Sequence, residues 1–205
     1  MDPGTNFPNQ ITLNAAGTYG YVANAGSNNI SVYSIDATTG ALTPVAGSPF
    51  ATGTGANLPT SVAMNPAGTY AFVANTGGNN ISVYSIDATT GVLTAVGTPV
   101  ATGGAPSWIT VNPAGTYAYV ANNTGNTVSV YSIDATTGGL TQVGSPVATG
   151  TGPYSVTVNP AGTYAYVANF LSNNVSAYSI NAATGALTQV GSPVAAGTGP
   201  HSATV

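Results

Sequence analysis

The 205-residue sequence contains no Lys, Arg, Glu or Cys, and charged residues make up only 2% of it. Nucleic-acid binding requires cationic side chains that neutralise phosphates, so we expect no nucleic-acid partner. The absence of Cys excludes disulfides, thiolate zinc sites and a Cys nucleophile. No apolar run approaches the ~20 residues of a membrane span. The N-terminus has neither a positive n-region nor an apolar h-region, so no signal peptide is visible in the chain as given.

The sequence does contain an internal repeat. The segment Asn-Pro-Ala-Gly-Thr-Tyr-Ala-Tyr-Val-Ala-Asn begins at Asn112 and again at Asn159, and near copies begin at Asn14 and Asn65. The period is about 47 residues, within the ~40–50 residues typical of propeller blades. The repeats predict a single array with units at 8–58, 59–105, 106–152 and 153–199, while 200–205 begin a fifth repeat or form an exchanged strand.

The sequence of each unit predicts four short strands. The first and second are illustrated by 155–158 and 164–168 in the fourth unit, and the third and fourth by 81–86 and 92–96 in the second unit. The strands alternate with period 2 and are separated by turn residues, and no segment has a helical period. The second and third strands are apolar on both faces, which indicates a sheet covered on both sides. The sequence therefore predicts an all-β fold of four-stranded antiparallel propeller blades. We expect Tyr119, Val120, Val130 and Tyr131 to be buried between blades.

The repeated strings at 21–24, 119–122 and 166–169 resemble the Tyr-Val-Thr-Asn repeat family. That family includes surface-layer-type propellers and lactonase-like seven-bladed propellers related to 6-phosphogluconolactonase. The Asp-x-Thr-Thr-Gly turn and the proline that opens each unit also fit the resemblance. The family implies a propeller fold, and its enzymes rely on charged groups around a central channel. This sequence has almost no such groups and only four units.

The titratable residues give no sign of catalysis. Asp36, Asp87 and Asp134 occupy the same turn, where the fourth unit has Asn181, so we interpret them as turn residues that accept backbone hydrogen bonds. His201 is the only histidine and has no acid beside it in the sequence. We therefore predict no catalytic residue, no metal site, no cofactor and no enzymatic activity.

One side of the array varies more than the other, since the loops after the second and fourth strands differ between units. The candidate binding face on this side comprises Trp108, Tyr154, Phe170, Leu171 and His201. Exposed aromatic residues in a loop-rich surface suggest recognition of a glycan or a protein. Drift in permissive loops is the alternative interpretation.

Four segments match the acceptor pattern for N-glycosylation, and they begin at Asn29, Asn80, Asn122 and Asn174. The match is also expected by accident in Asn-rich loops. It matters only if the protein is secreted in a glycosylating organism.

These features lead to three hypotheses of function. The first is a non-enzymatic, extracellular or cell-surface repeat protein with a structural or adhesive role, because a chain without Lys and Arg resists trypsin-like proteases. The second is a glycan- or protein-binding module that uses the variable face. The third is a fragment of a lactonase-like enzyme, against which the shortage of acid–base groups argues.

The ends of the chain predict self-association. Residues 9–13 and 201–205 both align with the first strand of a unit, so four units would have five such strands. A leftover strand exposes unpaired backbone groups and invites pairing with another chain. The alternative is that the chain is cut from a longer propeller. Otherwise, we expect exchange of terminal strands between copies, in a larger ring or a filament.

Overall fold

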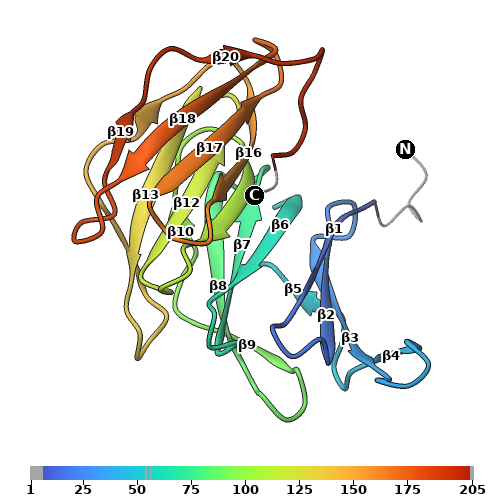
Figure 1. Ribbon diagram of the computed structural model, residues 1–205. Coiled ribbons are helices and arrows are strands. Elements are labelled where there is room, and N and C mark those ends of the chain that lie inside the picture. The colour runs from blue at the N-terminus through green and yellow to red at the C-terminus, as the bar shows by residue number, and fades with distance from the viewer. Residues whose placement is uncertain (1–6, 54, 56, 204–205) are drawn as a thin grey trace.

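The computed structural model describes residues 7–53, 55 and 57–203, and these residues form an all-β array (Figure 1). Their strands make four antiparallel sheets, which we call blades 1 to 4 in chain order. Within the described residues, no helix is long and apolar enough to cross a membrane. The predicted fold class is confirmed.

Each blade repeats the same order of strands. The innermost strands are β1 (Pro8–Leu13), β6 (Pro59–Met64), β11 (Pro106–Val111) and β16 (Pro153–Val158). The second strands are β2 (Tyr19–Asn24), β7 (Tyr70–Asn75), β12 (Tyr117–Asn122) and β17 (Tyr164–Asn169). The third strands are β3 (Asn29–Ile35), β8 (Asn80–Ile86), β13 (Thr127–Ile133) and β18 (Asn174–Ile180).

Two short strands share the outer edge of each third strand. The first of them, at one end of this edge, is β4 (Leu42–Pro44), β9 (Leu93–Ala95), β14 (Leu140–Gln142) or β19 (Leu187–Gln189). The other, which the sequence did not predict, is β5 (Phe50–Ala51), β10 (Val100–Ala101), β15 (Val147–Ala148) or β20 (Val194–Ala195). A two-residue strand is too short to show alternation, and for this reason the pattern missed it.

The turn between the first and second strands forms as its residues predict. In blade 4 the Gly162 N–H donates to the Asn159 carbonyl at 2.8 Å. The Asn159 side-chain oxygen accepts from the N–H groups of Thr163 at 2.8 Å and Tyr164 at 2.9 Å. The same asparagine bonds recur in the other blades, for example at Asn112. This asparagine therefore fixes the start of every second strand.

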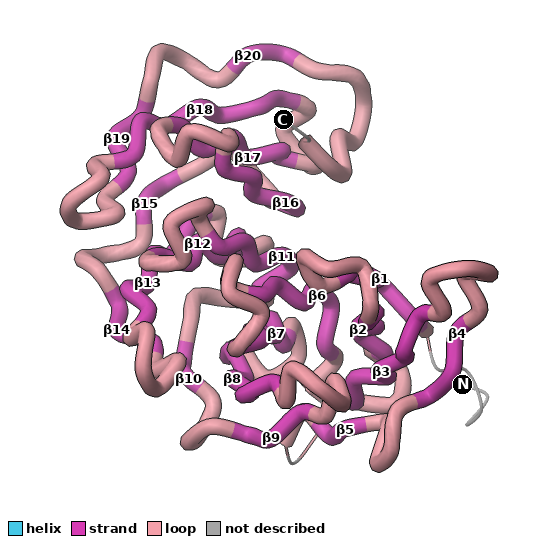
Figure 2. Tube along the Cα trace, turned by 60° about the horizontal axis from the view of Figure 1, so that its bottom comes forward, coloured by secondary structure: helices cyan, strands magenta, loops and turns pink. Residues whose placement is uncertain are grey.

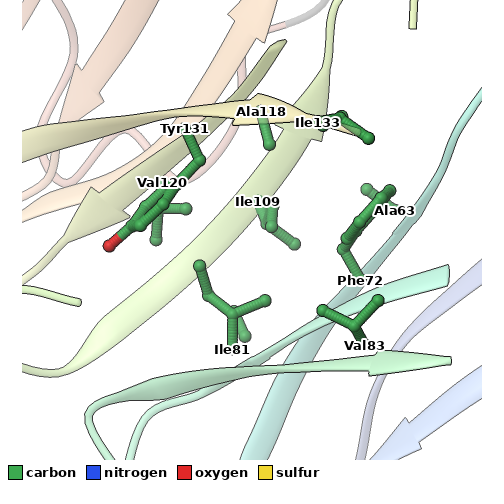
Figure 3. Close-up of a cluster of buried hydrophobic side chains, with 10 residues drawn as sticks. Ala63, Phe72, Ile81, Val83, Ile109, Ala118, Val120, Tyr131 and Ile133 are labelled. Atoms are coloured by element: carbon green, nitrogen blue, oxygen red, sulfur yellow. The ribbon is translucent and has the colours of Figure 1, made fainter. Parts of the chain in front are cut away.

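The blades stack face to face in an open arc, with the inner strands β1, β6, β11 and β16 following one another along it (Figure 2). Three hydrophobic clusters fill the three spaces between neighbouring blades. The cluster between blades 2 and 3 is drawn in Figure 3, where Ile81 and Val83 of β8 face Val120 and Tyr131 of blade 3.

Side chains alternate along the third strand between the two neighbouring spaces. Ile81 and Val83 belong to the cluster shared with blade 3, whereas Tyr84 belongs to the cluster shared with blade 1. Tyr119, Val120, Val130 and Tyr131 are all at most 3% exposed. The prediction that they are buried between blades is confirmed.

Tyrosine hydroxyls tie adjacent blades to each other's backbone. Tyr84, Tyr131 and Tyr178 donate to the carbonyls of Ala51, Ala101 and Ala148 in the preceding blade, at 2.7, 2.8 and 2.6 Å. These bonds satisfy the one polar atom of each largely buried ring, as buried tyrosines generally require.

A second set of tyrosines lies over glycines of the following blade. Tyr19, Tyr70 and Tyr117 cover Gly91, Gly138 and Gly185, and a Cβ atom on any of these glycines would overlap the ring. The same hydroxyls donate to carbonyls in that turn, those of Thr89, Thr136 and Ala183. We call this contact the tyrosine–glycine contact.

Burial of the tyrosines predicts a sharp alkaline limit to stability. Loss of hydration raises the pKa of Tyr21 to about 12, and burial also raises the pKa of Tyr84, Tyr119, Tyr131 and Tyr178. The unfolded chain releases these protons from about pH 10, so stability is complete below that pH and is lost as the pH rises through the folded values. Thermal midpoints followed by circular dichroism should stay level between about pH 5 and 9 and fall steeply above pH 10.

Two matched variants test whether ionisation of buried tyrosines causes the loss of stability at high pH. Tyr178→Phe should shift the alkaline transition upward, because one ionising group is gone, whereas Tyr154→Phe, at an exposed ring, should leave it in place. A fall in the thermal midpoint between about pH 5 and 9 would contradict the prediction and point to a titrating group other than tyrosine.

Candidate functional site

The inner strands of all four blades border one cleft on the concave side of the arc. Its volume is about 380 Å³. The lining residues are Gln10, Thr12, Val62, Ala63, Met64, Trp108, Ile109, Thr110, Val111, Val156, Thr157, Val158, Ser202 and Ala203. None of these side chains is ionisable, so the cleft offers only hydrogen bonds and apolar contacts.

The alternation of the inner strands places threonines toward the cleft. Thr12, Thr110 and Thr157 occupy the same position of β1, β11 and β16, where β6 has Ala63. Thr12 donates to the Val62 carbonyl at 2.8 Å. The hydroxyls of Thr110 and Thr157, and the indole N–H of Trp108, have no hydrogen-bond partner within the described part of the chain. These polar groups of the cleft lining are therefore available to a ligand.

Sequence reasoning missed this cleft as a site, although it named Trp108 among its candidates. The available signal was a threonine that recurs at one position of the first strand in three units. A hydroxyl in an alternating strand carries no chemistry by itself, so the pattern indicated only a strand.

The candidate binding face is brought together only in part. The rings of Tyr154 and Phe170 lie 6.1 Å apart, and the His201 ring contacts both edge to face, at 4.5 and 4.8 Å. Leu171 is 61% exposed in the loop after β17. Trp108 lies in the cleft instead. Glycan or protein binding by this face stays a prediction.

The aromatic cluster anchors the last described residues on blade 4. His201 packs against Tyr154 and Phe170, and the Gly199 N–H donates to the Asn173 side chain at 2.7 Å. This packing holds Ser202 and Ala203 at the edge of the cleft. Residues 201–203 are not in a strand, and the remainder of the predicted end strand, 204–205, lies outside the described residues.

The aspartates have the structural role that the turn pattern predicts. The Asp87 carboxylate accepts from the N–H groups of Thr89 and Thr90, both at 2.9 Å, and Asn181 makes the equivalent bonds in blade 4. Because the backbone N–H of Thr90 stabilises the anion most, the pKa of Asp87 is lowered. The pKa values of Asp36 and Asp134 are lowered by the same arrangement. These bonds commit each carboxylate to its own turn.

One of the four glycosylation candidates is inaccessible. Asn122 is fully buried, and its amide nitrogen donates to Ser129 at 2.8 Å and to Thr127 at 3.1 Å. A glycan on this nitrogen cannot coexist with the folded blade. Asn29, Asn80 and Asn174 are half-buried at the starts of β3, β8 and β18.

Stacked four-stranded blades around inner strands that line a cleft define the class of β-propellers. The model of the family described as "Lactonase, 7-bladed beta-propeller" matches residues 2–109 and 101–201. The chain therefore belongs to this lactonase propeller family, and the lactonase-like part of the resemblance is confirmed. Comparison with curated proteins gives no match.

Solved structures show the same fold. A putative 6-phosphogluconolactonase from Bacteroides fragilis is 24% identical, with a TM-score of 0.83 over 92% of this chain and 55% of that one. A protein from Lactobacillus plantarum is 25% identical, with a TM-score of 0.84 over 94% and 56% of the two chains. The periplasmic gluconolactonase of Pseudomonas aeruginosa is 17% identical, with a TM-score of 0.83 over 94% and 55%. The chain thus spans little more than half the length of these structures.

The family match corrects two predictions. A non-enzymatic structural or adhesive protein, and the absence of enzymatic activity, are contradicted, because lactonase-like propellers are enzymes. The alternative of a fragment of a lactonase-like enzyme fits better. The error came from counting acid–base groups over four units, although the similar structures contain nearly twice as much chain.

Proposed function

We propose that this chain forms a four-blade sector of a lactonase-like enzyme and that its inner-strand cleft binds the ring of an uncharged sugar lactone. The observation that carries the proposal is the presence of unpartnered donors in the cleft, among them Trp108, Thr110 and Thr157, in a chain of this family. A sugar lactone has hydroxyls and a carbonyl for such donors and an apolar ring face for the indole.

The absence of cations favours an uncharged substrate. Phosphate groups are generally held by Arg and Lys, and the chain has neither. A phosphorylated sugar lactone would therefore gain no ion pair from these four blades. We infer that this sector prefers an unphosphorylated lactone.

We assign two roles to the cleft: it binds the lactone ring and polarises the lactone carbonyl group. Hydrolysis of a lactone places negative charge on the carbonyl oxygen when water attacks, and fixed hydroxyl or indole donors stabilise that charge. The lining side chains contain no general base, so the described cleft positions the ring and does not itself take the proton of the attacking water.

The only Trp in the sequence gives a direct test, because Trp108 lies in the cleft. We expect a saturable change in tryptophan fluorescence on titration with a non-hydrolysable lactam analogue of gluconolactone, and a weaker response to its 6-phosphate. Thr110→Val should weaken binding about two- to tenfold, the equivalent of one hydrogen bond of ~0.5–1.5 kcal/mol.

Thr141→Val, an exposed threonine on β14, is the matched control and should bind as the original chain does. Lactone hydrolysis is followed in parallel as acid release above the spontaneous rate. Absence of saturable binding, or equal losses in the two threonine variants, would contradict the proposal.

An extracellular location remains a prediction from composition alone.

A further inference from the structure

One amide in the cleft differs from the other donors, because a backbone hydrogen bond fixes its orientation. The Gln10 side-chain oxygen Oε1 accepts from the Val62 N–H at 2.7 Å. Only the oxygen of an amide can accept from an N–H group, so this bond assigns Oε1 and Nε2 of Gln10 without ambiguity. The Nε2 group is therefore the arm of the amide that Val62 leaves unused.

The Gln10 Nε2 group is open to the cleft. Gln10 lines the cleft and is half-buried. Nε2 has no hydrogen-bond partner among the described residues, and it is not one of the buried polar atoms without a partner, so solvent reaches it. An amide nitrogen carries two N–H donors. Both donors of Gln10 are therefore available to a ligand in the cleft.

A second bond holds the same two strands together beside Gln10. Thr12 donates to the Val62 carbonyl at 2.8 Å, so both backbone polar groups of Val62 are bonded to side chains of β1. These two bonds hold the Gln10 amide against β6. A donor that is oriented before the ligand arrives stabilises charge on a carbonyl oxygen without a reorganisation cost.

The other inner strands have no equivalent oriented donor. The position of Gln10 is taken in them by Ser61, Trp108 and Ser155. Both serines are at most 1% exposed, and Ser61 accepts from the Ile109 N–H at 3.3 Å. Within the described residues no hydrogen bond fixes the Trp108 ring, and the hydroxyls of the cleft threonines rotate about the C–O bond. Gln10 alone is long enough both to bond the next strand and to reach the cleft.

We propose that the Gln10 amide binds and polarises the carbonyl oxygen of the lactone, which places that carbonyl on the blade 1 side of the cleft. The inference rests on the proposed function, because it assigns a residue to lactone binding in the same cleft. The sugar hydroxyls are then left to Thr110 and Thr157 of blades 3 and 4. Gln10 contributes a hydrogen bond alone, so it neither gives nor takes a proton.

Gln10→Glu tests the donor with little disturbance of the fold. A glutamate oxygen still accepts from the Val62 N–H, but a carboxylate has no N–H and repels the lactone carbonyl oxygen. Affinity for the lactam analogue of gluconolactone, measured by Trp108 fluorescence, should fall about tenfold or more, which is the loss of one hydrogen bond together with that repulsion. Gln142→Glu, at an exposed glutamine on β14, makes the same change of charge away from the cleft and should bind normally.

Infrared difference spectroscopy shows which donor holds the carbonyl. With an isotope-labelled carbonyl in the lactam analogue, the carbonyl band should move to lower wavenumber on binding, because an N–H bond weakens the C=O bond. At saturation this shift should be lost in Gln10→Glu and kept in Thr110→Val, because we assign Thr110 to the sugar hydroxyls. A merely structural role of Gln10 would not move the band.

The outcomes separate this inference from the proposed function, once circular dichroism confirms that each variant is folded. If the original chain does not bind the lactam saturably, the proposed function is wrong and the inference fails with it. If the lactam binds but its carbonyl band is unshifted, Gln10 is not the carbonyl donor and lactone binding in the cleft stands. The same conclusion follows if Gln10→Glu keeps both the shift and the affinity.

Discussion

Val130→Asp should destabilise the protein more than any other single change considered for these blades. Val130 is 3% exposed and belongs to the cluster between blades 3 and 4. The chain contains no Lys or Arg that could pair with a new carboxylate. An unpaired buried charge typically costs ~3–5 kcal/mol, which is a large part of the stability of an ordinary domain. The thermal midpoint should fall by roughly 10 °C or more.

Two companion variants separate charge from shape. Val130→Thr keeps the size of the side chain and adds only a hydroxyl, so its loss should be smaller. Thr141→Asp places the same carboxylate on the exposed outer strand of the same blade and should change stability by no more than about 0.5 kcal/mol. An unchanged midpoint in Val130→Asp would be incompatible with blades stacked through this cluster.

Gly138→Ala should have the second largest effect, because two separate costs add at this position. Its φ is +72°, a conformation that costs an L-residue ~1–2 kcal/mol. The new methyl group would also overlap the Tyr70 ring, whose hydroxyl is bonded to Thr136 in the same turn. Displacing a well-packed ring costs a further ~1–3 kcal/mol. The sum should appear in the denaturant midpoint.

Gly144→Ala isolates the backbone part of that loss. Gly144 lies in the same blade with a φ of +61°, but an added Cβ there meets nothing within 4 Å. This control should show the conformational cost alone. If both variants lose equal stability, the tyrosine–glycine contact contributes nothing and the account of the blade interface is wrong.

Much of the fold could be predicted because the second and third strands of each unit have apolar side chains on both faces. Ile81 and Val83 alternate with Tyr84, and each set fills a different space between blades. Such two-sided patterning is hard to satisfy except in stacked sheets. The hydrogen bonds between blades could not be predicted from the sequence. A tyrosine hydroxyl bonds to a backbone carbonyl there, and since every residue has a backbone carbonyl, the sequence does not mark the acceptor.

The site was predicted less well for a different reason. Three residues of the candidate binding face, Tyr154, Phe170 and His201, contact one another, since loops on one side of the repeat meet in space. The cleft instead depends on how Thr110 and Thr157 converge from different blades, which no local pattern contains. The absence of enzymatic activity was predicted wrongly because acid–base groups were counted over four units, whereas the similar structures contain nearly twice as much chain.

Contacts to backbone carbonyls also bear on how such a chain can be rearranged. The turn that receives the tyrosine hydroxyl supplies Thr89, Thr136 or Ala183 in different blades, and the bond forms in each case. Since the accepting side chain plays no part in this bond, the bond itself does not depend on which unit follows which. Duplication or deletion of whole units should therefore preserve this tyrosine contact at each new junction.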